Sequence, residues 1–159
     1  MSTSEEMTSI LSKTVKLNNG NEMPIFGLGT FKTKEETTYE SVKSALSLGY
    51  KLIDTARQYK NEIQIGKAIK DSKIERKDVF IVSKINFDEH GFEKTISSVD
   101  DSLKNLQVDF IDLMLIHWPG QNEDEFSKDE TNPKMRKETY KALEKCQKEG
   151  KLKNIGVSK

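Results

Sequence analysis

The chain has 159 residues, with 26 basic side chains, 26 acidic side chains and one cysteine. This length allows one domain with a sizeable core and is too short for two ordinary domains. The charge balance lacks the basic excess typical of proteins that bind nucleic acid or anionic membranes, so we expect a small-molecule partner and neither of those two. A single cysteine excludes a disulfide framework, and we expect Cys146 to be a small buried apolar residue.

Neither a membrane span nor a signal peptide is expected. A spanning helix needs about 20 consecutive apolar residues, and the longest apolar run, residues 113–116, has the size of a strand. Residues 1–13 are polar and lack the apolar centre of a signal peptide, so they are predicted to be a mobile tail. The predicted location is cytoplasmic, where reducing conditions suit a lone thiol.

The domain is predicted to begin with a small hairpin over residues 14–24 and to continue with a buried strand. The hairpin segment has an alternating run at residues 14–17, followed by asparagine and glycine for a tight turn. Residues 25–31 are mostly apolar and contain Gly27 and Gly29, which would let either a neighbouring strand or a ligand approach the backbone closely.

A helix and a second strand are predicted next. Thr33 and Glu36 have the spacing of a capping box, and Gly49 is placed to end the helix in a left-handed conformation. A short apolar run follows at residues 50–53. Residues 54–62 then form a polar loop that leads into another helix, for which Asn61 is a good N-cap.

Three further strands are predicted, at residues 79–82, 111–116 and 154–158, with helices between them. These helices carry apolar side chains at spacings of three and four, and a long acidic loop is expected over residues 118–133. Residues 111–116 are nearly all apolar, as in a parallel strand buried on both faces. Strands that alternate with helices predict an α/β fold with a parallel sheet and right-handed crossovers.

Ionisable side chains stand at the ends of three successive strands. Asp54, Lys84 and His117 follow the strands near residues 52, 79 and 111, and Tyr59 lies in the loop beside Asp54. The carboxyl ends of parallel strands meet at one edge of a sheet, where such folds bind ligands. Burying ionisable groups costs free energy unless they form ion pairs or take part in function. The four residues therefore predict one polar site.

Each of these residues also has an ordinary structural interpretation. Alone, Tyr59 would be a surface aromatic, Lys84 a cation at a strand end and His117 a core histidine. Residues 54–62 alone would be a loop before a helix. The coincidence of the four at one edge favours the site, and no role is predicted for His90, which lies in a polar loop.

The predicted chemistry is polarisation and protonation of a carbonyl without a metal ion. An ammonium near a phenol favours the phenolate, so Lys84 is expected to lower the pKa of Tyr59 from its usual value of about 10. Tyr59 would then serve as proton donor and acceptor, while Asp54 pairs with Lys84 and orients it. A neutral His117 can donate a hydrogen bond to a carbonyl oxygen or share the proton relay.

Several ordered motifs, over residues from about 14 to the end, resemble those of the aldo-keto reductases. The motifs are Gly27-Leu28-Gly29-Thr30, Asp54-Thr55-Ala56 with Tyr59 and Asn61-Glu62, Val82-Ser83-Lys84, Leu115-Ile116-His117-Trp118-Pro119, and Ile155-Gly156-Val157-Ser158. The resemblance implies an α/β fold of the (β/α)8 TIM-barrel type. The chain would hold the first four β/α units plus a fifth strand, preceded by an N-terminal β-hairpin, as a partial barrel domain over residues 14–159.

The resemblance also implies an activity, a cofactor and a set of site residues. Members of the family pass a hydride from a nicotinamide cofactor, usually NADPH, to an aldehyde or ketone carbonyl, without a metal. The matching catalytic residues are Tyr59 as general acid, Lys84 as the residue that lowers its pKa, Asp54 as the partner of Lys84, and His117 as the residue that orients the carbonyl. The matching cofactor-binding residues are Gly29, Thr30, Asp54 and Ser158.

The resemblance is incomplete in the substrate pocket and at the end of the chain. Trp118 matches a residue of the pocket wall, whereas Phe31 and Asn86 stand where tryptophan is frequent, so substrate preference is not carried over. Beyond Ser158 the family usually continues with three further strands and most of the cofactor site. Because a barrel of this class runs to about 250 residues, we expect a truncated product, a cut fragment or a half-barrel that self-associates through open sheet edges.

Two hypotheses for function follow. The first is an NADPH-dependent oxidoreductase, or the amino-terminal half of one, that reduces aldehydes or ketones to alcohols. The second is a non-catalytic half-barrel or interaction protein that retains the four residues by descent. Tight binding of NADPH by this chain alone is predicted to be absent. A phosphate-binding barrel enzyme of another chemistry is disfavoured, because that site lies late in such barrels.

Overall fold

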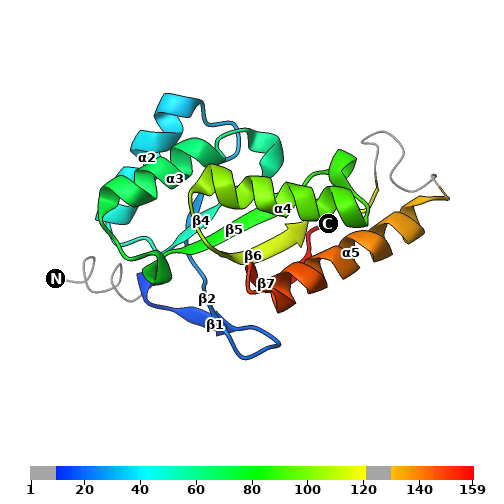
Figure 1. Ribbon diagram of the computed structural model, residues 1–159. Helices are drawn as coiled ribbons and strands as arrows, with labels where there is room; N and C mark the ends of the chain where they lie inside the picture. Colours follow the sequence, from blue (N-terminus) through cyan, green and yellow to red (C-terminus); the bar gives the residue numbers. More distant parts are fainter. Residues whose placement is uncertain (1–9, 121–129) are drawn as a thin grey trace.

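A computed structural model describes residues 10–120 and 130–159. This part of the chain forms an antiparallel hairpin and a five-stranded parallel sheet, with helices along one side of the sheet (Figure 1). The elements are β1 (Thr14–Lys16), β2 (Glu22–Pro24), β3 (Leu28–Gly29), α2 (Glu35–Ser47), β4 (Leu52–Asp54), the 3-10 turn η1 (Arg57–Tyr59), α3 (Glu62–Ser72), η2 (Arg76–Asp78), β5 (Phe80–Ile85), η3 (Phe87–Glu89), α4 (Phe92–Leu106), β6 (Ile111–Ile116), α5 (Asn132–Lys148) and β7 (Leu152–Val157). The predicted tail and the acidic loop lie largely outside the described residues.

The strands of the parallel sheet follow one another in chain order, from β3 to β7. Each strand is joined to the next by a segment that contains a helix, as the sequence predicts. The register sets Gly29 opposite Asp54, and Lys84 opposite Leu115. The carboxyl ends of the strands therefore lie along one edge of the sheet, which is where the predicted site residues stand.

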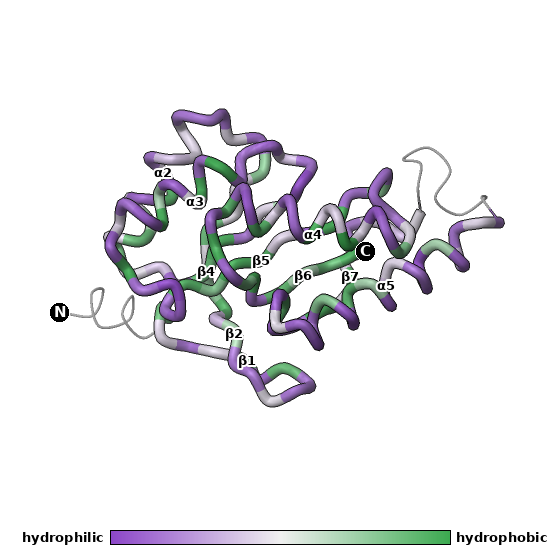
Figure 2. Tube along the Cα trace, viewed as in Figure 1, coloured by the Kyte–Doolittle hydropathy of each residue, from purple (hydrophilic) through white to green (hydrophobic). Residues whose placement is uncertain are grey.

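The core lies between the helices and the sheet. Helices α2, α3, α4 and α5 pack one against the next, and the strands they cover form the hydrophobic centre of the chain (Figure 2). Buried apolar residues on the helices fall at the predicted spacings: Val42, Ala45, Leu46, Ile65, Ala68, Ile69, Val99, Leu106, Ala142, Leu143 and Cys146. The helix predictions are therefore confirmed, and burial raises the pKa of the Cys146 thiol, in agreement with an inert core residue.

The predicted strand over residues 25–31 is wrong in extent. Only Leu28 and Gly29 pair with β4, while Ile25 and Phe26 are 52% and 37% exposed. Gly27 allows the close approach of a neighbouring strand, because a Cβ at this position would lie 2.6 Å from the carbonyl oxygen of Leu52. Of the two glycines, only Gly29 leaves open space beside the backbone.

Of the two predicted N-terminal caps, the one at Thr33 is wrong, whereas Asn61 occupies the predicted N-cap position without a side-chain cap. The N-cap of α2 is Lys34 rather than Thr33, and no side chain caps it. The Thr33 hydroxyl donates to the carbonyl oxygen of Thr30 at 2.8 Å instead. Asn61 is the N-cap residue of α3, but its side chain does not cap the helix. Gly49 has a φ of 87°, so its predicted left-handed conformation is confirmed.

Strand β6 is less completely buried than predicted. Met114 and Ile116 on one face are buried, and so is Ile111 on the other face, but Leu113 and Leu115 on the same face as Ile111 are only partly buried. The helices cover one side of the sheet (Figure 1), so Leu113 and Leu115, which point to the other side, are less covered in the described part of the chain than Met114 and Ile116.

The hairpin is attached to β7 through asparagine side chains that the sequence did not single out. Asn154 is 5% exposed, and its Oδ1 accepts hydrogen bonds from Asn19 Nδ2 at 2.7 Å and from Asn21 Nδ2 at 3.0 Å. Asn154 Nδ2 in turn donates to the carbonyl oxygen of Asp112 at 2.6 Å. The β1–β2 turn is thereby fixed to the amino-terminal half of the sheet's last strand.

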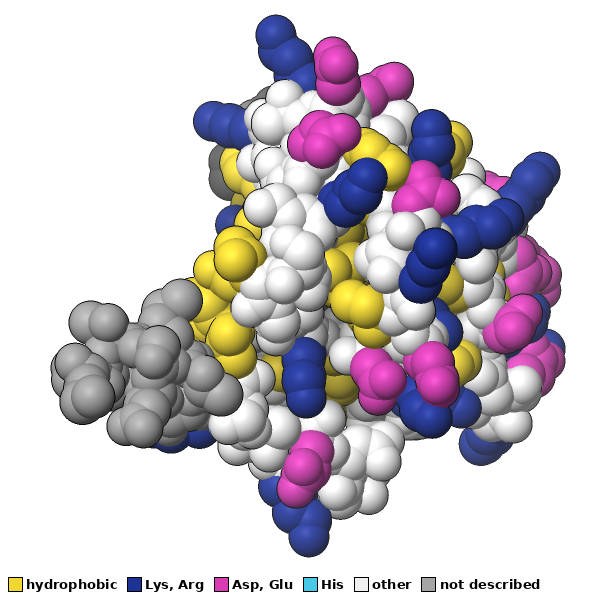
Figure 3. Space-filling view, turned by 90° about the vertical axis from the view of Figure 1, so that its left-hand side faces the viewer, with side chains coloured by type: hydrophobic (Ala, Val, Ile, Leu, Met, Phe, Trp, Pro, Cys, Tyr) yellow, Lys and Arg dark blue, Asp and Glu magenta, His cyan; other side chains and the backbone are white. Residues whose placement is uncertain are grey.

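Acidic and basic side chains are interspersed on the surface, in agreement with the zero net charge (Figure 3). Within residues 10–120 and 130–159, none of the helices is long and apolar enough to cross a membrane. The same residues contain no cluster of three or more histidine, cysteine, aspartate or glutamate side chains that could hold a metal ion.

Candidate active site

Asp54 and Lys84 form an ion pair at the carboxyl edge of the sheet. Asp54 is the last residue of β4 and Lys84 the next-to-last residue of β5. Lys84 Nζ donates to Asp54 Oδ1 at 2.6 Å and to the carbonyl oxygen of Thr55 at 2.8 Å. The side chain of Lys84 is 8% exposed and that of Asp54 38%. The predicted ion pair is therefore present, and the Asp54 carboxylate is partly exposed to water.

Tyr59 ends the short η1 turn and lies beside this pair. The Nζ atom of Lys84 is 5.4 Å from the centroid of the Tyr59 ring. Burial and the Asp54 carboxylate raise the pKa of Tyr59, so the predicted direction of its shift is wrong. The physical reason is that Asp54 and Thr55 already bind the Lys84 ammonium, while the half-buried phenol is desolvated.

His117 follows β6 and also lies beside the Tyr59 ring. The two rings are 5.9 Å apart between centroids, in an edge-on arrangement. Burial, and then the ammonium groups of Lys84 and Lys159, lower the pKa of His117 to about 4. The imidazole is therefore neutral at neutral pH and can donate one ring hydrogen bond.

The three predicted pocket residues lie at different places around this site. Phe31 is 61% exposed, and its ring centroid is 4.9 Å from that of Tyr59. Trp118 lines a cavity of about 690 Å³ together with Ser158. Asn86 lines a separate cavity of about 640 Å³. The structure thus brings Phe31 to Tyr59, but it does not gather all three residues around one space.

Some of the predicted cofactor residues have free space or exposed groups beside them, and others are already hydrogen-bonded within the chain. A Cβ added to Gly29 would meet no atom within 4 Å, so the space at the end of β3 is free for a ligand. Thr30 is 1% exposed, and its hydroxyl donates to the carbonyl oxygen of Asp54 at 3.1 Å. Ser158 is partly buried, and its backbone N–H donates to the carbonyl oxygen of Ile116. Gly29, Asp54 and Ser158 therefore fit a ligand at this edge, whereas the Thr30 hydroxyl is used internally.

Asn61 and Glu62 connect the loops of the site, a function that the sequence did not predict. Asn61 is 1% exposed; its Nδ2 donates to the carbonyl oxygen of Thr30 and its Oδ1 accepts from the Thr55 hydroxyl, both at 2.9 Å. Glu62 is 3% exposed and accepts a hydrogen bond from the hydroxyl of Ser83 at 2.8 Å. The available signal was the position of two polar residues at the start of a helix, directly after the Tyr59 loop.

His90 lies in the loop between η3 and α4, as predicted, but its side chain is buried. It is 1% exposed, and neither ring nitrogen has a hydrogen-bond partner within the described part of the chain. Burial, and then Arg136, lower the pKa of His90. It stands between η3 and α4, on a different element from the Tyr59 turn.

Comparisons with known proteins agree with the fold and with the order of the motifs. The model of the aldo/keto reductase family matches residues 25–159. The chain is 47% identical over 154 residues to the glyoxal reductase of Bacillus subtilis, covering 96% of this chain and 51% of that protein. It is 40% identical over 143 residues to a methylglyoxal reductase of Escherichia coli, covering 90% and 48%. The chain thus spans about half the length of these relatives.

Solved structures lead to the same conclusion. An aldo/keto reductase from Brucella melitensis superposes with a TM-score of 0.82 and 41% identity, covering 91% of this chain and 52% of that one. An aldo-keto reductase of Bombyx mori in complex with NADP superposes with a TM-score of 0.79 and 29% identity, covering 91% and 50%. The chain therefore belongs to the aldo/keto reductase family, and its five parallel strands and their helices form part of that family's (β/α)8 barrel.

Proposed function

We propose that this chain carries the proton-donating part of a carbonyl reductase site, with Tyr59 as general acid. The observation that supports this role is the position of the Tyr59 ring, with Lys84 Nζ 5.4 Å from its centroid and the His117 ring 5.9 Å away. The raised pKa of Tyr59 keeps the phenol protonated at neutral pH, which is the form needed to donate a proton to a developing alkoxide.

The other three residues assist this transfer. The Lys84 ammonium, held by Asp54 and the Thr55 carbonyl oxygen, lies close enough to the phenol to stabilise the phenolate that forms when the proton leaves. The neutral imidazole of His117 donates a hydrogen bond to the carbonyl oxygen and orients it. A residue bound to the oxygen before the reaction lowers the entropy cost of reaching the reactive geometry.

The proposed cofactor is NADPH, which supplies the hydride when bound. The Bombyx mori relative, whose structure is a complex with NADP, supports a nicotinamide cofactor in the family. We assign its nicotinamide end to Gly29, Asp54 and Ser158, with Thr30 supporting them through the hydrogen bond of its hydroxyl to the carbonyl oxygen of Asp54. The open space beside Gly29 and the partly exposed Asp54 carboxylate are compatible with a ligand there.

The proposed substrates are small aldehydes and ketones. The names of two relatives, glyoxal reductase and methylglyoxal reductase, favour short dicarbonyl compounds within this class. Phe31, Asn86 and Trp118 are the proposed side chains of the substrate pocket, and the contact of Phe31 with Tyr59 makes Phe31 the strongest of the three.

The test is carbonyl reduction by the Tyr59→Phe variant. Methylglyoxal-dependent oxidation of NADPH is measured for the chain, and for a chimera in which the carboxyl-terminal half of the Bacillus subtilis glyoxal reductase continues it. We expect turnover in the chimera and a loss of at least about 10²-fold in its Tyr59→Phe variant, because a general acid contributes about 10²–10⁴-fold. Binding of NADPH, followed by Trp118 fluorescence, should survive the substitution. Equal turnover in the two chimeras would refute the role of Tyr59.

A non-catalytic half-barrel is the second candidate, and the one-sided pairing of β7 favours it. Within the described residues β7 pairs only with β6, so its other edge is open to another chain, and Val157 on this strand is 67% exposed. Fluorescence of Trp118 tests this candidate, which predicts that the chain alone does not respond to micromolar NADPH. Saturable quenching would count against this second candidate.

A further inference from the structure

Glu62 is the first residue of α3, and its side chain is almost completely buried. It is 3% exposed, whereas Glu35, the first residue of α2, is exposed. A carboxylate at a helix N-terminus is favoured by the helix dipole, but burying it requires compensating hydrogen bonds. The partners of Glu62 therefore indicate what this burial achieves.

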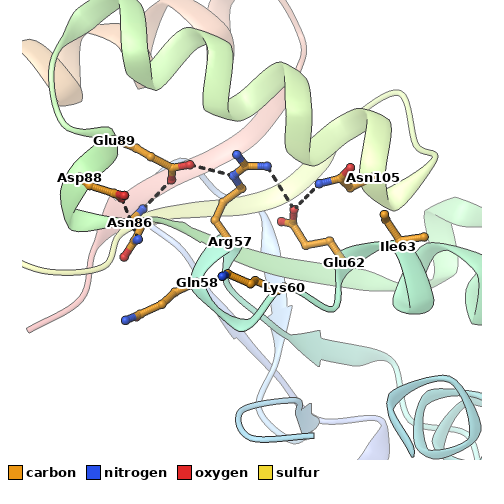
Figure 4. A pocket seen from close by; sticks show the side chains of 9 residues that line it. All are labelled: Arg57, Gln58, Lys60, Glu62, Ile63, Asn86, Asp88, Glu89 and Asn105. Carbon is orange, nitrogen blue, oxygen red and sulfur yellow. Dashed lines mark hydrogen bonds and ion pairs between the residues drawn. The ribbon is translucent and has the colours of Figure 1, made fainter. Parts of the chain in front are cut away.

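The two carboxylate oxygens of Glu62 bind side chains from different elements. Oε1 accepts the hydrogen bond from Ser83, which is fully buried in β5 and directly precedes Lys84. Oε2 accepts a hydrogen bond from Asn105 Nδ2 of α4 at 3.3 Å and lies 3.9 Å from an Nη atom of Arg57 (Figure 4). One side chain thus joins α3 to the strand of Lys84 and to the turn of Tyr59.

Arg57 extends these contacts to the other flank of Tyr59. It is the first residue of η1, and its Nε donates to Glu89 Oε1 at 3.0 Å (Figure 4). The second oxygen of Glu89 accepts from the backbone N–H of Asn86, just after β5, at 2.9 Å. Tyr59 lies in the chain between Arg57 and Glu62, so both flanks of the turn are tied to β5 or to the residues that follow it.

The polar network lines a cavity to which Tyr59 does not contribute. Gln58 and Lys60 line the cavity of about 640 Å³ together with Arg57, Glu62 and Glu89, but Tyr59 does not. The network therefore leaves the phenol free to face Lys84 and His117.

We propose that Glu62 is a positioning residue, which holds the Tyr59 turn against β5 and thereby keeps the phenol beside the Lys84 ammonium. It acts through Ser83 and Arg57 rather than on the reacting atoms. The inference rests on the proposed function of Tyr59 and Lys84 as the proton-donating pair.

The test uses Glu62→Gln. This substitution preserves the shape of the side chain but replaces one carboxylate oxygen with an NH2 group, which cannot accept hydrogen bonds from Asn105 or Arg57. The readout is the rate of tyrosine nitration by tetranitromethane, resolved by residue with mass spectrometry. This reagent attacks the phenolate, so the rate reports both the exposure and the ionisation of a tyrosine. Tyr140, 37% exposed on α5, is the internal reference. In the variant, the ratio of Tyr59 to Tyr140 nitration should rise about three- to tenfold, because a released phenol regains water and its raised pKa falls.

Two further variants make the result specific. Glu35→Gln removes a charge at the same helix position from an exposed side chain, and it should leave the ratio unchanged. Ser83→Ala changes little volume and removes only one bond to Glu62, so it should raise the ratio by a smaller factor even if Glu62→Gln fails to fold. The proposal is overturned if the ratio stays unchanged in the folded variants, or if all four tyrosines react faster by the same factor.

The nitration result is independent of turnover, so the two proposals can fail separately. Full carbonyl reduction by the Tyr59→Phe chimera removes the proposed function, whatever the nitration rates are. Loss of reduction in that variant, with an unchanged nitration ratio in Glu62→Gln and Ser83→Ala, removes only the positioning role of Glu62.

Discussion

At the scale of single residues, the sequence predicted which side chains lie together, but not how their neighbours shift their pKa values. Asp54, Lys84 and His117 could be placed together because parallel strands share one carboxyl edge. The pKa of Tyr59 shifts upward rather than downward because desolvation exceeds the effect of an ammonium that is already paired. Burial of this kind depends on packing between distant segments, which strand-end positions do not reveal.

The low pKa of His117 predicts a pH-dependent stability. The unfolded chain takes up a proton as the pH falls through 6.5, whereas folded His117 stays neutral down to about 4. The free energy of unfolding should therefore decrease across this window, by about 1–2 kcal/mol when solvent screening is allowed for. Urea unfolding at about pH 7 and about pH 5 measures the decrease, which should be smaller in His117→Asn. Lys70→Gln, on the exposed face of α3, is the control, and an undiminished decrease in His117→Asn would contradict the assignment.

At the scale of helices and strands, the existence of each element was predictable, but several ends were not. The spacing of apolar residues identified helices α2, α3, α4 and α5 of the described residues, since a buried face recurs every three or four positions. The side-chain caps are absent because Thr33 and Asn61 both donate to the carbonyl oxygen of Thr30, which is three residues from Thr33 and 31 from Asn61. The strand after Pro24 is shorter than its apolar composition suggests, because only Leu28 and Gly29 reach the register of β4. Tertiary partners decided most of these differences.

The close packing of α3 and α4 at Gly66 leads to a prediction of stability. A Cβ at Gly66 would lie 2.3 Å from the carbonyl oxygen of Leu106, which is backbone and has little freedom to move. Gly66→Ala should destabilise the fold by about 1–3 kcal/mol, even though alanine favours a helix over glycine by about 1 kcal/mol. Urea unfolding at neutral pH measures the difference. Gly29→Ala, where the added Cβ meets open space, should change stability by less than about 0.5 kcal/mol, and an equal effect of both substitutions would argue against the packing explanation.

At the scale of the whole molecule, the sheet has two strands with a neighbour on one side only. In the described residues β3 pairs only with β4, and β7 only with β6. The sequence predicted this open sheet from the number of strands, and the comparisons agree that the chain spans about half of related proteins. The anchoring of the hairpin by Asn154 was not predictable, because it joins residues more than a hundred positions apart.

The exposed edge of β7 predicts self-association in solution. Val157 is 67% exposed on this strand, so a charged side chain there should disfavour pairing with a second copy. Val157→Lys should shift the sedimentation-equilibrium mass toward the monomer. Leu48→Lys changes a residue of similar exposure, 66%, at the end of α2, and it should leave the association unchanged. A parent chain that stays monomeric at high concentration would exclude pairing through this edge.

The order of the strands has a further consequence for how the protein folds. Every strand of the parallel sheet pairs with the strand that precedes or follows it in the chain, so each pairing closes a loop of only one helix and its connections. Loops of this size have a moderate closure entropy, and folding can therefore proceed by adding one strand and helix at a time. The contact of Lys84 with Asp54 then requires only two adjacent units, and it can form early along such a pathway.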